Sequence, residues 1–279
     1  MLTKKQIEEI AHLQHVCELE DSLQLKLNWD FLQTRSEQER NDYFYYEDGK
    51  LVGFIALYGF GSKVEICGMV DPSYRRKGTF TALFFHVMKV VKERKYTTIL
   101  LNAPSNSKSA KEFLKTVPCT YTFSEYQMKW QETELIEDES VVLRMATPRD
   151  FETEVLLDVQ CFGEDETSAR EFTKQIKEEN LQQTYIIETK GKTVGKIRLS
   201  ISHDEAWIFG FAVFPEYQGK GIGKKALSRI VLREHRAGYP IFLEVEAKNA
   251  NALKLYESCG FKAFYSQDYY EYQGTAQTH

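Results

Sequence analysis

The pattern of apolar and polar residues changes period several times along the chain, and each period indicates one type of element. Trp207–Val213 is an apolar run that predicts a strand, and apolar residues at helical spacing predict a helix from 222 to 236. Gly238 and Pro240 end that helix, and Ile241–Val245 predicts another short strand. A strand, a turn, a helix and a strand therefore follow one another around residue 220.

The first half of the chain opens differently. It begins with an amphipathic helix, whose apolar positions include Leu2, Ile7, Ile10 and Leu13. Tyr43–Tyr46 then predicts a buried strand.

Comparison of the sequence with itself shows that the two halves repeat. Residues 70–78 (Val-Asp-Pro-Ser-Tyr-Arg-Arg-Lys-Gly) resemble residues 213–221 (Val-Phe-Pro-Glu-Tyr-Gln-Gly-Lys-Gly) at an offset of 143. Upstream, residues 47–53 resemble residues 189–195 at an offset of 142, and both segments predict hairpins around a Gly-Lys turn. The chain is therefore predicted to be two copies of one domain.

Length and charge place the boundary between the copies. The 279 residues match two domains of the usual size, each of about 140 residues. Residues 131–140 are acidic and lack aromatic side chains, and Val141–Met145 predicts the first strand of the second copy. We predict domains at residues 1–136 and 141–279.

Residues 218–224 join the strand that ends at Val213 to the helix that begins at Ile222. Three glycines let the backbone approach an anion closely, and the free N–H groups and the dipole of the helix N-terminus favour negative charge. This arrangement predicts a phosphate or pyrophosphate ligand. The spacing fits neither a Walker P-loop, in which Ser or Thr follows the lysine, nor the Gly-x-Gly-x-x-Gly dinucleotide fingerprint.

Two motifs of the second half resemble one known family. One has the form Gln/Arg-x-x-Gly-x-Gly/Ala, and the other is Asn-x-x-Ala-x-x-x-Tyr followed by Gly-Phe. Their residues are Gln218, Gly221 and Gly223, and Asn249, Ala252, Tyr256, Gly260 and Phe261. Together they resemble the GNAT (Gcn5-related N-acetyltransferase) superfamily over about residues 141–272. The resemblance implies an α/β fold in each copy: a twisted mixed β-sheet flanked by helices, with two splayed central parallel strands.

The resemblance also implies acetyl-CoA as the co-substrate. The pantetheine arm would pair with a strand edge, the pyrophosphate would bind the loop, and Asn249 would bond the pantetheine. Lys224 and Lys225 would meet the adenosine 3′-phosphate. The cofactor contacts implied in this way are Phe211, Ala212, Val213, Gln218, Gly219, Lys220, Gly221, Ile222, Gly223, Lys224 and Asn249.

Acetyl transfer to an amine needs a base that takes a proton from the amine and an acid that protonates the leaving thiolate. The resemblance places the acid at Tyr256. It suggests Glu244 as the base, because Leu-Glu-Val followed by Asn resembles the ribosomal-protein and protein N-terminal acetyltransferase branch. Glu205 lies two residues before the position at which some GNAT enzymes carry a glutamate, and it is the second candidate. His203 is a weaker one.

The first copy departs from this pattern. Phe80 stands where a small residue is usual and could crowd the phosphates, although Arg75–Lys77 keep the positive charge. Leu114 occupies the tyrosine position, and Leu101 and Asn102 replace the glutamate. We therefore expect the first copy to be non-catalytic, and whether it still binds CoA stays open.

Composition narrows the remaining classes of protein. The formal net charge is −5, from 36 basic and 41 acidic residues, so no chain-wide nucleic-acid-binding surface is indicated. No apolar run approaches the roughly 18 residues of a membrane span, and no signal-like apolar segment follows Met1. Five cysteines without a CxxC pair indicate reduced thiols in the cytoplasm. His12 and His15 lack a third ligand at suitable spacing, so no metal is expected.

The leading hypothesis is a cytoplasmic, acetyl-CoA-dependent N-acetyltransferase, in which a primary amine of a small molecule or peptide attacks the thioester directly. A non-enzymatic acyl-CoA-binding or sensing protein, and an acyltransferase that uses another acyl-CoA, are the alternatives. The sequence distinguishes neither the acceptor nor the oligomeric state.

Overall fold

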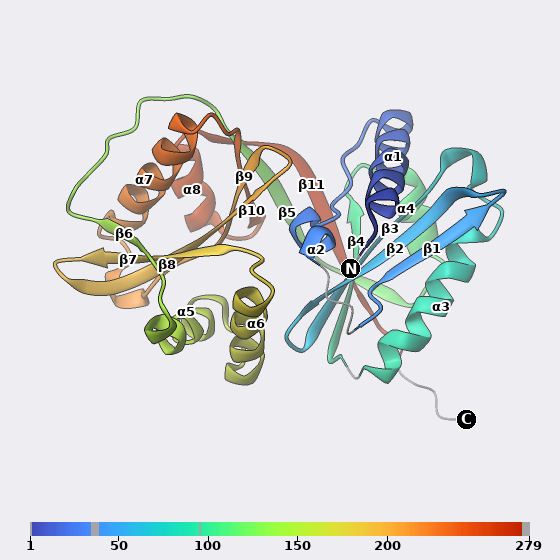
Figure 1. Ribbon diagram of the computed structural model, residues 1–279, viewed down its shortest axis with the longest axis horizontal. Coiled ribbons are helices and arrows are strands. Elements are labelled where there is room, and N and C mark those ends of the chain that lie inside the picture. Colours follow the sequence, from blue (N-terminus) through green and yellow to red (C-terminus); the bar gives the residue numbers. More distant parts are fainter. Residues whose placement is uncertain (1, 35–38, 95, 275–279) are drawn as a thin grey trace. The chain divides into compact units, whose positions relative to one another are not determined.

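The computed structural model of the protein describes residues 2–34, 39–94 and 96–274 (Figure 1). The chain forms two compact units. Met1–Ser124 together with Tyr265–His279 make up the first unit, and Glu125–Phe264 make up the second.

A mixed β-sheet forms the centre of the first unit. Its elements are α1 (Lys4–Asp21), α2 (Trp29–Thr34), β1 (Asp42–Glu47), β2 (Lys50–Phe60), β3 (Lys63–Val70), the 3-10 helix η1 (Pro72–Tyr74), α3 (Thr79–Glu93), β4 (Thr98–Pro104), α4 (Lys108–Leu114) and the end of β11 (Phe261–Tyr272). The strand order is β1-β2-β3-β4-β11, and only β3 and β4 are parallel. Ile55, Ile66 and Val87 join β2, β3 and α3 in one apolar cluster. The predicted N-terminal helix is confirmed as α1, which Thr3 caps.

The second unit repeats this plan. Its elements are the end of β5 (Cys119–Trp130), β6 (Val142–Met145), η2 (Pro148–Asp150), α5 (Phe151–Phe162), α6 (Glu166–Glu178), β7 (Gln183–Thr189), β8 (Lys192–Ser202), β9 (Glu205–Val213), η3 (Pro215–Tyr217), α7 (Ile222–Arg236), β10 (Ile241–Glu246) and α8 (Ala250–Ser258). The strand order is β6-β7-β8-β9-β10-β5, and the parallel pair is β9 and β10. The predicted mixed α/β fold is confirmed.

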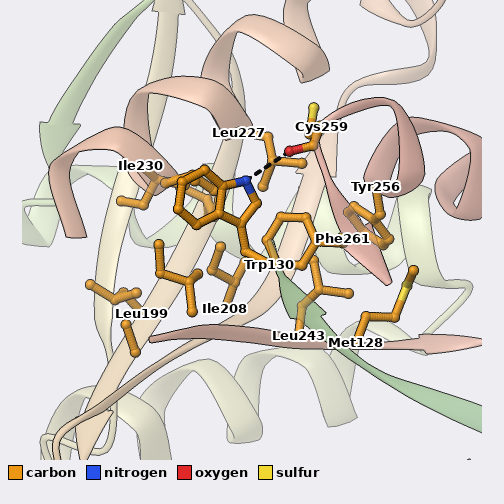
Figure 2. Packing of buried hydrophobic residues seen from close by; sticks show 14 of the residues in the cluster. Met128, Trp130, Leu199, Ile208, Leu227, Ile230, Leu243, Tyr256, Cys259 and Phe261 are labelled. Carbon is orange, nitrogen blue, oxygen red and sulfur yellow. Dashed lines mark hydrogen bonds between the residues drawn. The ribbon is translucent and has the colours of Figure 1, made fainter. Parts of the chain in front are cut away.

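Trp130 of β5 lies in the core of the second unit. It packs with apolar residues of β9, α7 and the start of β11, among them Ile208, Leu227 and Phe261 (Figure 2). Its indole Nε1 donates a hydrogen bond of 2.9 Å to the carbonyl of Cys259, at the end of α8. A strand from the first half of the chain therefore fixes the end of the helix that carries Tyr256.

The compact units differ from the predicted domains 1–136 and 141–279 because each takes its last strand from the other half. Residues 125–129 pair with β10 in the second unit, and residues 267–271 pair with β4 in the first. Alternating apolar residues identify a strand, but they carry no information about its partner. The sequence pattern therefore could not reveal this exchange.

The acidic segment predicted as the boundary between the two copies, residues 131–140, is bound to α7. Asp138 Oδ2 lies 2.8 Å from Lys225 Nζ, and Glu137 Oε2 lies 2.8 Å from Arg236 Nη2. The Lys225 ammonium and two hydrogen bonds from Ser140 lower the pKa of Asp138. The segment is thus an ordered part of the second unit.

Candidate functional site

The two parallel strands of the second unit separate part-way along their length. Their pairing ends with Ile208 opposite Leu243. Beyond this point β9 continues to Val213, paired with β8, and β10 continues to Glu246, paired with β5. We call the diverging ends, residues 209–213 and 244–246, the second splay. The expectation of splayed central strands is confirmed here.

A bulge bends β9 at the start of this splay. The register between β8 and β9 shifts between Lys196 and Arg198, so that β9 carries one additional residue there. Gly210 has φ +49°, and a Cβ on it would lie 2.3 Å from the Arg198 guanidinium. Only glycine fits this close approach in a left-handed conformation. In the first unit β2 and β3 pair without a shift in register. The one additional residue in β9 therefore explains why the offset between the repeats increases from 142 to 143.

The loop after β9 forms an anion site built from backbone amides. Gly219 and Gly221 have φ of +71° and +76°, and α7 begins at Ile222. Within the described part of the chain, the N–H groups of residues 219–224 have no hydrogen-bond acceptor. The Gln218 side chain donates a hydrogen bond of 2.8 Å to the Val213 carbonyl, which fixes the loop to the end of β9. Such convergent amides at a helix N-terminus bind phosphate groups.

The lysines in and just after this loop differ in whether their ammonium groups already contact other groups of the protein. Lys220 folds back, and its Nζ lies 2.6 Å from the Glu216 carbonyl. Lys225 is paired with Asp138, so the expectation that it meets the 3′-phosphate is not supported. Lys224 is exposed at the first turn of α7. Of Lys224 and Lys225, Lys224 is the one that forms no ion pair with the acidic segment in the described structure.

Tyr256 lies on α8 in the core of the second unit. Its ring is 6.5 Å from that of Phe211 on the splayed end of β9 and 6.2 Å from that of Phe261. Figure 2 shows Tyr256 beside Phe261. Burial raises the pKa of Tyr256 to about 12, so its phenol is protonated at neutral pH. Asn249 caps α8, because its side chain accepts a 3.0 Å hydrogen bond from the Ala252 amide.

Glu244 is the first residue of β10 beyond the last rung shared with β9. Its neighbours Leu243 and Val245 point into the core that contains Tyr256, so strand alternation turns Glu244 to the other face of the sheet. Gln127 of β5 donates a 3.0 Å hydrogen bond to Glu244 Oε1 and is itself only 3% exposed. The carboxylate is thus oriented by a buried amide at the point where the strands separate.

Glu205 lies at the other end of β9. It comes four residues before Phe209, which corresponds to about 13 Å along a strand. Its Oε2 accepts a 2.8 Å hydrogen bond from the indole of Trp207. His203 lies in the turn before β9. The structure therefore brings Glu244, but not Glu205 or His203, to the splay.

Comparison with known sequences gives the family. The sequence profile of the acetyltransferase (GNAT) family matches residues 5–116 and again residues 151–261. The chain belongs to this family. The two matches confirm that it contains two copies of the GNAT domain.

Curated relatives match only part of the chain. The ribosomal protein bS18-alanine N-acetyltransferase of Salmonella typhimurium is 42% identical over 78 residues, which cover 27% of this chain and 51% of that protein. The Escherichia coli K12 protein of the same name is 44% identical over 69 residues, which cover 24% and 47%. The chain thus spans about half the length of these relatives.

Solved structures show the same fold. A GCN5-related N-acetyltransferase from Sphaerobacter thermophilus superimposes with a TM-score of 0.73 at 17% identity, covering 94% of this chain and 91% of that one. A tandem GNAT protein from the clavulanic acid biosynthesis pathway gives 0.69 at 14% identity, covering 99% and 98%.

The first GNAT copy has the same splay without a carboxylate and a phenol at the corresponding positions. Its parallel pairing ends with Ile66 opposite Leu101, so Asn102 stands where Glu244 stands in the second copy. Leu114 occupies the position of Tyr256 on α4 and is buried. Sequence comparison left Leu101 and Asn102 as joint replacements for the glutamate, and the register selects Asn102.

Two features of the GNAT site were missed by sequence reasoning. Gln127 comes from a strand of the other half, and no local motif links it to Glu244. Lys196 of β8 is 1% exposed and pairs with Asp158 of α5 at 2.6 Å, directly opposite Ala212 in the β8–β9 register. Burial lowers the pKa of Lys196 to about 8. In a sequence, a lysine inside a predicted strand usually indicates a face exposed to solvent, so the pattern did not predict that Lys196 is buried.

Across the residues that the structure describes, no cluster of three or more His, Cys, Asp or Glu side chains could hold a metal ion. Nor does any helix of the described ranges have the length and apolarity needed to cross a membrane.

Proposed function

We propose that this protein is an acetyl-CoA-dependent N-acetyltransferase whose reaction takes place in the second unit. The observation that carries the proposal is the position of Glu244 and Tyr256. They lie on opposite faces of the sheet, next to the gap that opens between β9 and β10. A thioester held in that gap would meet a base on one side and an acid on the other.

The residues around the gap fit acetyl-CoA. The amides of residues 219–224 suit its diphosphate, and the exposed charge of Lys224 suits a further phosphate. The edge of Phe211–Val213 that faces β10 can pair with the two amides of the pantetheine arm, as an added strand would. When bound, acetyl-CoA supplies an activated acyl carbon.

Glu244 and Tyr256 would then move the two protons of the reaction. An amine of pKa near 10 is mostly protonated at neutral pH, so Glu244 takes a proton from it directly or through one water. The neutral nitrogen attacks the acyl carbon, the carbon–sulfur bond breaks, and Tyr256 donates its phenolic proton to the leaving thiolate. The nitrogen loses its second proton as the amide forms, and this proton returns through water to the Tyr256 oxygen. The raised pKa of Tyr256 keeps that proton in place until the thiolate forms.

We further propose a primary amine of a peptide or small molecule as the acceptor. The relatives from Salmonella typhimurium and Escherichia coli are named for transfer to an alanine of a ribosomal protein. Because this chain spans only about half the length of those relatives, an assay with a panel of amines identifies the acceptor.

A matched pair of variants tests the proposal. Release of CoA is measured with acetyl-CoA and a panel of amines and N-terminal peptides for the wild type, Glu244→Gln and Glu205→Gln. We expect Glu244→Gln to lower kcat/KM by about 10²- to 10⁴-fold, the usual contribution of a general base. Glu205→Gln should stay within about threefold, because Glu205 lies at the far end of β9. Equal losses in both variants, or CoA release by neither the wild type nor the variants, would contradict the proposal.

A further inference from the structure

Three aromatic side chains form a row on the face of the second unit's sheet that carries Glu244. Strand alternation places Trp207 and Phe209 of β9 and Phe242 of β10 on this face, because the alternate residues of both strands belong to the apolar core. The rings of Trp207 and Phe242 are stacked with their centres 5.0 Å apart, and those of Trp207 and Phe209 are 6.4 Å apart. We call these three residues the aromatic row.

The aromatic row is only partly covered by the protein. Trp207 and Phe209 are half-buried, whereas Phe242 is 6% exposed. Helix α5 covers this side of the sheet further along β9, where its Leu157 packs with Ala212. Apolar side chains that gather on an accessible face mark a binding surface, whereas single exposed ones do not.

Contacts within the second unit fix the orientation of the row. The indole Nε1 of Trp207 donates a 2.8 Å hydrogen bond to Glu205 Oε2. Lys129 Nζ lies 5.3 Å from the centre of the Phe242 ring, and the ring of Phe264 packs against Phe242 at 5.8 Å. Phe242 is therefore enclosed by its neighbours, and the accessible ring surface belongs to Trp207 and its partner on β9.

The row ends beside Glu244, where the strands separate. The last rung of the parallel pair joins Ile208 to Leu243, so Phe209 and Glu244 are the first residues beyond it on their two strands. Both lie on the same face, on either side of the gap that is proposed to hold the thioester. Phe242 precedes Glu244 by two residues, which is about 7 Å along a strand. An amine at Glu244 therefore has ring surface within the reach of a short carbon chain.

The charges beside the row match an amine with a neutral substituent. Lys129 Nζ lies over the Phe242 ring, and Arg198 of β8 stands opposite Phe209 in the β8–β9 register. The Arg198 guanidinium reaches Gly210, at the start of the second splay. A second ammonium on the acceptor would meet these cations, whereas a neutral ring would stack on the row without repulsion.

We propose that the acceptor of the second unit is a primary amine with an aromatic ring roughly two or three bonds from its nitrogen, matching the spacing of about 7 Å along β10. Its ammonium contacts Glu244, and its ring contacts Phe209 and Trp207, which determine the specificity. Arylalkylamines and peptides with an aromatic first residue share this chemistry. The inference rests on the proposed transfer reaction and names the class of its acceptor.

Selectivity between matched amines tests this class. Release of CoA from acetyl-CoA is measured with 2-phenylethylamine, ethylamine and 1,4-diaminobutane, and with tripeptides that begin with phenylalanine or alanine. In the wild type, kcat/KM for the phenyl compound should exceed that of its small counterpart by about 10- to 100-fold, the effect of burying one ring. A preference within the amines or within the tripeptides supports the class and identifies the source of the acceptor.

Two matched variants test the part of the row. Phe209→Ala should lower the ratio of the two kcat/KM values about tenfold or more, because it removes the ring beside the splay. Phe264→Ala should leave the ratio within about threefold, since Phe264 contacts Phe242 from β11, which lies beyond β5 in the strand order. A smaller amount of folded protein lowers both kcat/KM values and leaves their ratio unchanged. A ratio that Phe209→Ala does not change overturns the assignment.

A binding measurement separates this inference from the proposed reaction. Calorimetry with 2-phenylethylamine in the presence of CoA records binding without turnover. Acetyl transfer with a phenyl ratio near one, or with a preference for 1,4-diaminobutane, overturns the acceptor class while the reaction stands. Binding of 2-phenylethylamine that Phe209→Ala abolishes, without CoA release in the wild type, supports the acceptor site while the reaction fails. Neither transfer nor binding overturns both.

Discussion

The two units carry the same loop at the same helix N-terminus, but only the second has a carboxylate and a phenol at the splay. Gly78 and Gly221 share one backbone conformation, and both loops are held by the last carbonyl of the preceding strand. At the splay, Asn102 and Leu114 of the first unit occupy the positions that Glu244 and Tyr256 occupy in the second unit. If the proposed roles hold, the loop that would bind phosphate is common to both units, whereas the proposed acid and base belong to the second unit alone.

A second difference lies on β8 and β9. The second unit has the bulge at Gly210 and the buried Lys196, whereas the first unit has a regular β3 and a buried Phe54 in place of the lysine. Bulges occur next to active sites because they redirect a strand edge. The second unit thus departs from a regular apolar sheet at the strand proposed to hold the co-substrate.

The largest effect is expected when Tyr256, the proposed acid of the second unit, is replaced by leucine, the residue at the same position of the first unit. Tyr256→Leu should lower kcat by about 10²- to 10⁴-fold, and Tyr256→Phe by a similar factor, because each removes the proton for the thiolate. Affinity for acetyl-CoA should stay within about threefold. Steady-state kinetics and calorimetry measure the two quantities.

Tyr239→Phe is the control for these variants, since Tyr239 packs at the edge of the same core. It should leave kcat unchanged. A normal kcat in Tyr256→Phe would show that water or another group protonates the thiolate. Leu114→Tyr should not create activity in the first unit, because Asn102 cannot take the proton of an amine.

Each unit has one phenyl ring between a strand and a helix: Phe80 of α3 lies over Gly68 of β3, and Phe211 of β9 lies beside Gly223 of α7. An intermediate effect is expected when this ring is moved from strand to helix in the second unit. Phe211→Gly should lower the free energy of unfolding by about 2 kcal/mol or more, since it removes a half-buried ring. Gly223→Phe alone should also destabilise, because it places two rings in one space. The double variant imitates the first unit and should be more stable than the sum of the single changes predicts, by about 1 kcal/mol or more. Urea unfolding of the four proteins gives this coupling, and strict additivity would refute the exchange of rings.

The sequence could predict this repeat and its loop, because glycines and charges at fixed spacing report local backbone geometry. It also offered Tyr256 and Glu244 as candidates, because their motifs lie within one helix and one strand. It missed the strand exchange and Gln127, because pairing between distant strands leaves no local signal. The contact of the Phe80 ring with β3 left no local signal either, since its space depends on Gly68 in another element.

Lys196 provides the smallest and most specific test of the difference between the units. Burial lowers its folded-state pKa from 10.5 to about 8, so between these pH values the unfolded chain binds one more proton than the folded protein. The free energy of unfolding should therefore gain a contribution that rises with pH in this window, by at most about 1.4 kcal/mol per pH unit. Other groups that titrate there are common to the wild type and to Lys196→Met/Asp158→Asn and cancel in the difference. Burial raises the pKa of the Cys161 thiol most, while Lys196 lowers and Asp158 raises it, so removal of both charges changes that pKa in opposite directions. Urea unfolding at pH 8, 9 and 10 should give a smaller slope for Lys196→Met/Asp158→Asn, which removes the pair without leaving a buried charge. Phe54→Leu, in the same place in the first unit, should leave the slope unchanged, and equal slopes in all three proteins would mean that Lys196 stays charged in the folded state up to pH 10.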